Sequence, residues 1–225
     1  MVAKESRTVL PLPDGVRVGT SGWSYPSWRP GFYPAGTDPA EFLAFYAERL
    51  STVELNVTGY RLPAEEQFRR WAAQVPDGFE FAPKLPGGRL RGLDVFGDRM
   101  RALGDRLGPV RVSLKSPRDD GIIELLLGSL DTGPSREGLR LAFDLEHPSW
   151  DGVEERLAAA GAVRVDDLES PAPFRYLRRR EAPDEAFAAQ VAAAREPVYV
   201  YFRHDDEPDA PAHAARLVDL LRNHR

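Results

Sequence analysis

Cysteine is absent from the 225 residues of this chain. Its absence excludes disulfides, thiolate metal ligands and a cysteine nucleophile, and it fits a reducing compartment. Long apolar runs are missing too: no stretch of about 18 consecutive apolar residues occurs, so no membrane-spanning helix is expected. The N-terminal sequence lacks the apolar segment of a signal peptide. We therefore expect a soluble, cytoplasmic protein without a membrane partner.

An excess of positive charge is also missing. The chain has 35 acidic and 30 basic residues, for a net charge of −5. A protein that holds nucleic acid through a general positive field is normally basic, so we do not expect nucleic acid as a partner. The sequence contains no phosphate-binding Walker loop, dinucleotide-binding glycine pattern, nucleophile-elbow serine or H-E-x-x-H zinc motif. It therefore indicates no particular cofactor, predicts no metal site and leaves the oligomeric state open.

The chain does contain short β-branched or aromatic runs that alternate with helical segments. We expect strands over residues 16–19, 52–55, 79–82, 110–114, 139–145, 163–166, 174–177 and 198–202. We expect helices over residues 39–50, 64–74, 95–107, 121–130, 153–160, 184–194 and 210–221. This alternation predicts a parallel sheet. Eight repeats predict an α/β fold in which residues 1–225 form a single (β/α)8 TIM barrel.

Two parts of the chain depart from a regular repeat. The connection over residues 168–173 is too short for a full helix, so the crossover between the sixth and seventh strands is expected to be truncated. Residues 1–14 precede the first expected strand, and we expect them to form a flexible N-terminal extension.

Several expected strands alternate polar and apolar residues, which is unusual for strands buried in a parallel sheet. An antiparallel sheet with one solvated face would also give this pattern, but the intervening helices argue against it. In a barrel, the apolar side chains pack on the helices and the polar ones point into the lumen. The alternation therefore predicts that four arginines point inward and meet carboxylates such as Glu54 or Glu80: Arg17, Arg111, Arg140 and Arg164.

Another set of polar residues falls at the ends of the expected strands, where the active sites of such barrels form. It consists of Asn56, Lys84, Lys115, Glu146 and Asp166. Trp23 and Tyr25 lie in the loop after the first strand and could form a stacking wall over the same cleft. These positions predict a pocket at the C-terminal ends of the strands.

The first third of the chain resembles a known family. GTSGWSYPSW at Gly19–Trp28 is followed by YAERLSTVELNVTGYRLP at Tyr46–Pro63 and GFEFAPK at Gly78–Lys84. This order of uncommon residues is similar to the YecE-like family, also called domain of unknown function 72. The resemblance implies a (β/α)8 barrel but no activity, because the family is named for lacking one. The positions that match its motifs are Trp23, Glu54, Asn56, Tyr60, Lys84, His147 and Trp150, with Asp166 a weaker match.

The chain departs from the family pattern at positions where a pocket is expected. Asp144 stands where glutamate is usual, Glu146 where arginine is usual, Arg203 where asparagine is usual and Gly59 where phenylalanine is usual. Since Glu146 reverses a charge that Arg203 could restore, we predict that these two residues pair across the barrel mouth.

The main functional hypothesis is an enzyme that acts on a small anionic or phosphate-bearing ligand. Glu54, Asp144 and His147 are the candidate catalytic residues, because carboxylates and histidine can transfer protons. Eight residues are candidates for ligand binding: Trp23, Tyr25, Asn56, Tyr60, Lys84, Trp150, Asp166 and Arg203.

Each of these assignments has a purely structural alternative. Glu54 could neutralise an arginine in the lumen, Lys84 could pair with Glu54 or Asp144, and His147 could anchor a loop through hydrogen bonds. The aromatic residues could simply order a long loop. The alternative function is accordingly a barrel that binds or assembles without catalysis, having lost its ancestral pocket residues. A nucleic-acid hydrolase is a weaker alternative, given the charge and the missing metal motif.

Overall fold

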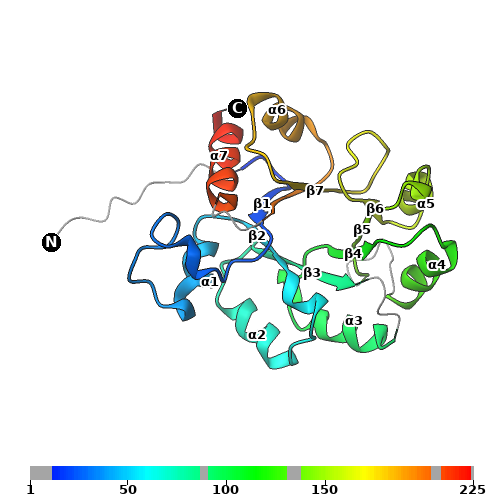
Figure 1. Cartoon of the computed structure of the whole chain (residues 1–225), viewed down its shortest axis with the longest axis horizontal. Helices are drawn as coiled ribbons and strands as arrows, with labels where there is room; N and C mark the ends of the chain where they lie inside the picture. Colours follow the sequence, from blue (N-terminus) through cyan, green and yellow to red (C-terminus); the bar gives the residue numbers. More distant parts are fainter. Residues whose placement is uncertain (1–11, 87–90, 131–137, 204–208, 224–225) are drawn as a thin grey trace.

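Eight parallel strands form a nearly closed barrel in the computed structural model, which describes residues 12–86, 91–130, 138–203 and 209–223 (Figure 1). The strands lie in the order β6-β5-β4-β3-β2-β1-β8-β7. Their bounds are β1 (Val16–Thr20), β2 (Thr52–Leu55), β3 (Glu80–Pro86), β4 (Val110–Leu114), β5 (Leu141–Leu145), β6 (Val163–Arg164), β7 (Arg175–Arg179) and β8 (Val198–Phe202). The predicted parallel α/β barrel is confirmed, and β2, β4 and β8 have the predicted bounds.

The barrel has an unsealed seam between β6 and β7, the two ends of the strand order. Asp166 bridges this seam: its backbone N–H donates to the carbonyl oxygen of Tyr176 at 3.0 Å, and its Oδ1 accepts the backbone N–H of Arg178 at 2.6 Å. Asp166 has a φ of 65°, a left-handed conformation that aspartate tolerates better than most residues. A single residue therefore provides hydrogen bonds that a continuous strand would otherwise make.

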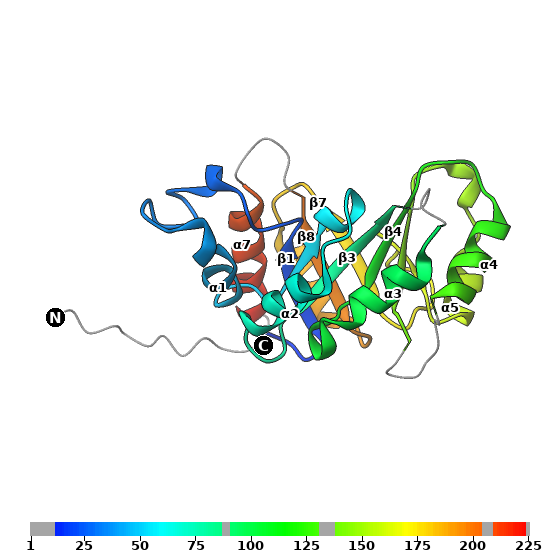
Figure 2. The same ribbon diagram turned by 90° about the horizontal axis from the view of Figure 1, so that it is seen from below.

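Helices surround the strands on the outer side (Figures 1 and 2). The α-helices are α1 (Phe42–Ala47), α2 (Glu65–Ala73), α3 (Leu93–Arg101), α4 (Asp120–Ser129), α5 (Glu154–Ala159), α6 (Glu185–Ala193) and α7 (Ala210–Asn223). The short 3-10 helices are η1 (Pro26–Trp28), η2 (Pro39–Glu41), η3 (Asn56–Gly59), η4 (Gly104–Arg106) and η5 (Pro148–Trp150). No described helix lies between β6 and β7, as the short connection predicts.

Aspartate caps start three of these helices. The side chain of Asp38 accepts the backbone N–H of Ala40, and the carboxylate of Glu41 accepts the backbone N–H of Asp38. Asp119 and Asp184 cap α4 and α6 in the same way. Such caps satisfy backbone donors that have no partner within the helix.

Apolar residues fill two separate regions. The larger lies between the sheet and the helices. The smaller lies inside the barrel and contains Ala82, Ala142, Val163, Val165, Phe174, Tyr176, Tyr199 and Tyr201. Its tyrosines bring hydroxyl groups into the lumen, where the polar residues of the strands can bond to them.

The predicted inward position is confirmed for three of the four arginines. In the lower lumen, Arg17 and Arg140 both meet Glu80, with Nε of Arg17 3.5 Å and a guanidinium nitrogen of Arg140 2.6 Å from the carboxylate. Tyr199 also donates to Glu80, at 2.8 Å. Arg111 meets Glu54 higher in the barrel. Polar residues on alternating positions thus face the lumen, as expected for a barrel.

The prediction for Arg164 is wrong. Its guanidinium group pairs with Asp151 and with Glu154 in the first turn of α5, outside the barrel. Val163 and Val165 point into the lumen instead. The physical reason is that β6 has only two residues and pairs Arg164 with Phe143, which packs in the outer core.

The N-terminal prediction falls mainly on residues 1–11, which lie outside the described residues. Leu12 packs against the outer core, so that part of the expected extension is anchored. Among the described residues, no helix combines the length and apolar character needed to cross a membrane.

Candidate functional site

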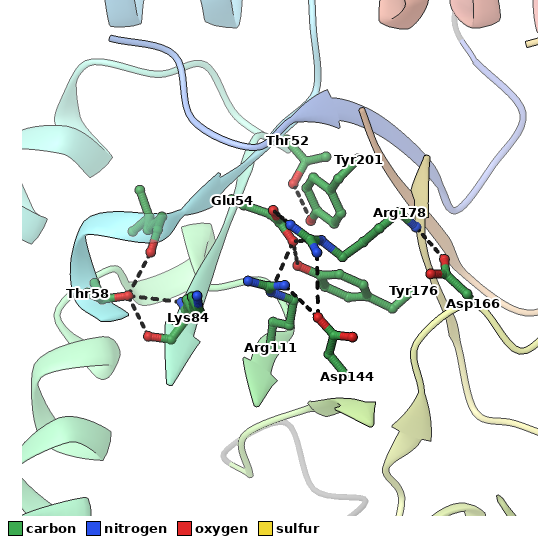
Figure 3. Close-up of polar contacts among 11 residues, drawn as sticks. Thr52, Glu54, Thr58, Lys84, Arg111, Asp144, Asp166, Tyr176, Arg178 and Tyr201 are labelled. Carbon is green, nitrogen blue, oxygen red and sulfur yellow. Dashed lines mark hydrogen bonds and ion pairs between the residues drawn. The ribbon is translucent and has the colours of Figure 1, made fainter. Parts of the chain in front are cut away.

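Glu54 is the central residue of the barrel mouth, with 1% of its surface exposed. It points inward from β2, and its carboxylate accepts hydrogen bonds from Tyr176 Oη at 2.8 Å and from Arg178 Nε at 2.9 Å (Figure 3). A second oxygen accepts from Arg178 at 3.1 Å. Arg178 therefore holds Glu54 with the two-pronged geometry that favours arginine–carboxylate pairs.

Two arginines join Glu54 to Asp144. Arg111 lies 3.3 Å from Glu54 through Nε and donates to Asp144 at 2.7 Å. Arg178 approaches Asp144 at 3.5 Å. Burial alone would raise the pKa of Glu54, but the positive charges of Arg178 and Arg111, with the hydrogen bonds from Arg178 and Tyr176, lower it below its ordinary value. Glu54 is thus a charged carboxylate with occupied oxygens, which corresponds to the structural alternative considered for it.

Lys84 lies beside this network, inward-facing on β3. Among the described residues, no carboxylate lies within salt-bridge distance of its ammonium group, which instead lies 5.9 Å from the ring centre of Tyr60. Partial burial lowers the pKa of Lys84, and the charges of Arg111 and Arg178 lower it further, whereas the negative charges of Glu54 and Asp144 partly oppose the shift. The ion pair with Glu54 or Asp144, considered as the structural alternative for Lys84, is therefore not formed.

η3 fixes the position of Lys84. The hydroxyl of Thr58 accepts the backbone N–H of Lys84 at 2.9 Å and lies 2.8 Å from its carbonyl oxygen. A Cβ atom at Gly59 would lie 3.0 Å from Cδ of Lys84. The phenylalanine usual at this position would displace the aliphatic part of the lysine side chain. The present position of Lys84 therefore depends on the absence of a side chain at Gly59.

Asp166 completes the polar groups at the mouth. Although Asp166 is exposed at the rim, the adjacent barrel wall desolvates its carboxyl group and raises its pKa to about 6, and the negative charges of Asp144 and Glu54 act in the same direction. The hydrogen bond from the backbone N–H of Arg178 opposes this shift. A carboxyl group with this pKa can exchange a proton near neutral pH.

A cavity of about 490 Å³ adjoins the mouth on the side of α1 and α2. Glu54, Asn56 and Tyr25 lie in its lining, as does Trp23. Gly22 has a φ of 96°, and a Cβ atom there would lie 2.6 Å from the hydroxyl of Tyr25. Glycine thus allows Tyr25 to fold back over the loop, where its hydroxyl donates to the carbonyl oxygen of Ser21 at 2.9 Å.

The structure brings most of the predicted site residues to the barrel mouth or to the adjoining cavity. Glu54, Lys84, Asp144 and Asp166 border the barrel mouth, and Trp23, Tyr25 and Asn56 line the adjoining cavity. Tyr60 is 79% exposed beside Lys84.

His147 and Trp150 have structural partners instead. Nδ1 of His147 accepts the backbone N–H of Ser149 and caps η5. Trp150 is fully buried and donates to the carbonyl oxygen of Ser116 at 3.0 Å. Neither residue joins the network at the barrel mouth.

The predicted pair of Arg203 and Glu146 is not formed among the described residues. Glu146 pairs with Lys115 at 3.4 Å, on the exposed end of β4 and β5. The backbone N–H of Arg203 donates to the carbonyl oxygen of Arg179. The charge that Glu146 introduces is thus compensated locally, away from Glu54.

Sequence reasoning missed Arg178, Tyr176 and Trp71. The expected seventh strand ended at Leu177; continuing its alternation places Tyr176 and Arg178 on the inward side. Trp71 packs against the outer core and also lines the cavity with Gln67 and Gln74. Gln67, Trp71 and Gln74 are spaced by four and three residues, which puts them on one face of α2 and its C-cap. This spacing can be seen in the sequence.

No cluster of three metal-ligating side chains occurs in the described part of the chain. The arrangement instead offers a buried ion network, a lysine beside it, an acidic group with a raised pKa and an aromatic cavity.

Comparison with known proteins agrees with this architecture. The UPF0759 protein YecE of Escherichia coli K12 is 29% identical over 158 residues, which cover 65% of this chain and 54% of the relative. The chain thus spans about half the length of the curated relative it matches. The YecE protein of Escherichia coli O157:H7 matches to the same extent.

Two crystal structures of a DUF72 family protein from Enterococcus faecalis V583 have the same fold. Their TM-scores are 0.72 and 0.68 at 18% and 17% sequence identity, and the matches cover 92% of this chain and 95% and 97% of theirs. A family model described as "Protein of unknown function DUF72" matches residues 17–225. The resemblance noted from the motifs is therefore confirmed, and the chain belongs to the DUF72 family.

Proposed function

We propose that the barrel mouth binds a small anionic, phosphate-bearing ligand, and that the protein is an enzyme acting on it. The observation that carries this proposal is Lys84, a half-buried lysine that has no carboxylate partner among the described residues and lies beside two buried guanidinium groups.

The balance of charge supports an anion. Arg111 and Arg178 are occupied by Glu54 and Asp144, so these four charges largely cancel. Lys84 adds a positive charge that has no carboxylate within salt-bridge distance among the described residues, and Asp166 offsets it only above its pKa of about 6, where it has lost its proton. Because the site is partly shielded from water, its attraction for an anion is stronger than that of a lysine on an open surface.

Asp166 is the acid–base group that we assign to the reaction. Its raised pKa, about 6, allows it to donate or accept a proton near neutral pH. Glu54 is less suited to this role, because its pKa is lowered and its oxygens already accept several hydrogen bonds. Asp166 thus replaces His147 and Glu54 as the candidate for proton transfer.

Titration calorimetry with phosphate and simple phosphomonoesters tests the binding step. The proposal predicts that Lys84→Ala abolishes the heat of binding that the wild type gives. Lys115→Ala is the matched control, since Lys115 is an exposed lysine that already pairs with Glu146. Identical heats for the wild type and Lys84→Ala would remove the anion site.

A barrel that binds the same ligand without catalysis is the second candidate. It is favoured by the engagement of both Glu54 and Asp144 in ion pairs, and by the capping role of His147. A turnover assay with the phosphomonoesters that bind separates the two candidates. Turnover that Asp166→Asn removes, while binding persists, supports the enzyme; binding without turnover supports the second candidate.

A further inference from the structure

The cavity beside the barrel mouth has aromatic and aliphatic walls. Trp23 and Trp71 form one side of it, with ring centres 5.4 Å apart and an angle of 88° between their planes. Leu43 and Leu55, both buried, provide apolar surface. Aromatic and aliphatic walls of this kind gain most from enclosing a flat ring.

Amide side chains give the same cavity a polar edge. Asn56, Gln67 and Gln74 contribute to its lining. The side-chain oxygen of Gln67 accepts a hydrogen bond from Arg70 at 2.8 Å, which leaves its NH2 group as a donor. Amides recognise the edges of heteroaromatic rings because they carry a donor and an acceptor side by side. A heteroaromatic ring therefore matches this lining better than a purely aliphatic group.

The cavity and the anion site share a boundary. Glu54 is part of the cavity lining and also the centre of the network beside Lys84. η3 also adjoins both sites. Asn56 and Val57 line the cavity, whereas Gly59 faces the aliphatic part of the Lys84 side chain. One ligand can thus place a ring in the cavity and an anionic group next to Lys84.

We infer that the ligand is a phosphate bearing a heteroaromatic ring, a class that includes the nucleoside monophosphates. The ring packs against the side of the cavity that Trp23 and Trp71 form, and the phosphate meets Lys84. This inference rests on the proposed function, because it assigns a ring site to the ligand of the same anion site.

Titration calorimetry with AMP, ribose 5-phosphate and adenosine separates the two sites. AMP is expected to bind the wild type about tenfold more tightly than ribose 5-phosphate, as stacking of one base on an aromatic residue predicts. Trp71→Leu should remove this difference without weakening ribose 5-phosphate. Gln67→Leu, at a partly exposed position that leaves the aromatic wall intact, should reduce the difference in affinity between AMP and ribose 5-phosphate. This second variant keeps the inference testable if Trp71→Leu does not fold.

Each outcome has a definite meaning. An AMP affinity equal to that of ribose 5-phosphate, or a tenfold gain that survives Trp71→Leu, overturns the ring site while the anion site stands. Binding of adenosine that depends on Trp71, with no binding of either phosphate, overturns both the proposed function and the joint ligand. Loss of both phosphates in Lys84→Ala, with the binding of adenosine unchanged, supports the inference.

Discussion

Glu54 carries a fully buried negative charge, so the free-energy cost of burying it depends on the groups that surround it. Arg178 and Tyr176 donate hydrogen bonds to it, and Arg111 adds a second positive charge. Removing one partner from such a network leaves uncompensated charge in the interior, which is strongly destabilising.

We predict that Glu54→Gln lowers the free energy of unfolding by about 3–5 kcal/mol, the usual cost of breaking a buried ion pair. Urea denaturation measures this change. Glu65→Gln is the control, because it removes an exposed partner of Arg69 on α2 and should cost less than about 1 kcal/mol. Equal losses in the two variants would contradict a buried network that depends on the charge of Glu54.

Asp166 makes a contribution to stability that depends on pH. Its pKa is about 6 in the folded protein against 3.8 in an unfolded chain. Between these values the folded protein holds a proton that the unfolded chain has released, so the contribution of Asp166 to stability falls as the pH rises through this window.

Asp166→Asn should remove this contribution while retaining an oxygen that accepts the backbone N–H of Arg178. Asparagine also tolerates the left-handed φ of this residue. We expect the difference in unfolding free energy, wild type minus variant, to decrease from pH 4 to pH 6 and to be constant above. A difference that does not change with pH would mean that the pKa of Asp166 is ordinary.

At the scale of elements, the seam between β6 and β7 is the least regular part of the barrel. β1 and β8 are paired over five residues, whereas β6 pairs with β5 over two. β7 pairs with β8 along one edge, but its edge at the seam meets Asp166 rather than a strand. Local opening needs less free energy where few backbone hydrogen bonds and contacts must break.

Hydrogen exchange should therefore be faster for the amides of β6 and for the edge of β7 that faces it than for those of β1 and β8. The amide of Asp166, which donates to Tyr176, is expected to exchange together with this edge. Protection of the seam equal to that of β1 and β8 would show that the barrel closes there as firmly as elsewhere.

The elements also show what the sequence could and could not predict. The eight strands were identifiable because each is a short β-branched or aromatic run between helices, and alternation placed Arg17, Arg111 and Arg140 inside correctly. Arg164 was misplaced because a strand of two residues has no period to read. Arg178 was missed because the end of a strand is set by its pairing with a neighbour, here β8, and not by local sequence.

For the site, the sequence indicated that Lys84 and Asp166 lie at strand ends and that Glu54 and Asp144 are candidate catalytic residues. It could not show which charges pair, because that depends on how far long side chains reach. Arg111 starts low in the barrel and still contacts both Glu54 and Asp144, the two carboxylates that were considered as partners of Lys84.

At the scale of the whole molecule, the lumen contains two polar levels separated by apolar residues. The lower level, with Glu80 between Arg17 and Arg140, lies at the N-terminal ends of the strands, where barrels have structural residues. The upper level contains Glu54, Arg111, Arg178 and Asp144, and opens toward Lys84 and the aromatic cavity. Because only the upper level opens toward Lys84 and the cavity, we propose the binding site at the mouth.

The central claim is that Lys84 meets an anion, and the scarcity of lysine makes it directly testable. The chain has three lysines, Lys4, Lys84 and Lys115, so NMR of protein labelled with ¹³C at the lysine Cε atoms gives three signals, of which Lys84→Arg identifies one. We predict that Lys84 titrates below the ordinary range of lysine, and that phosphate shifts the Lys84 signal and raises the pKa of Lys84 while leaving the Lys115 signal unchanged. A Lys84 signal that does not respond to phosphate, or that responds no more than Lys115, would contradict the claim.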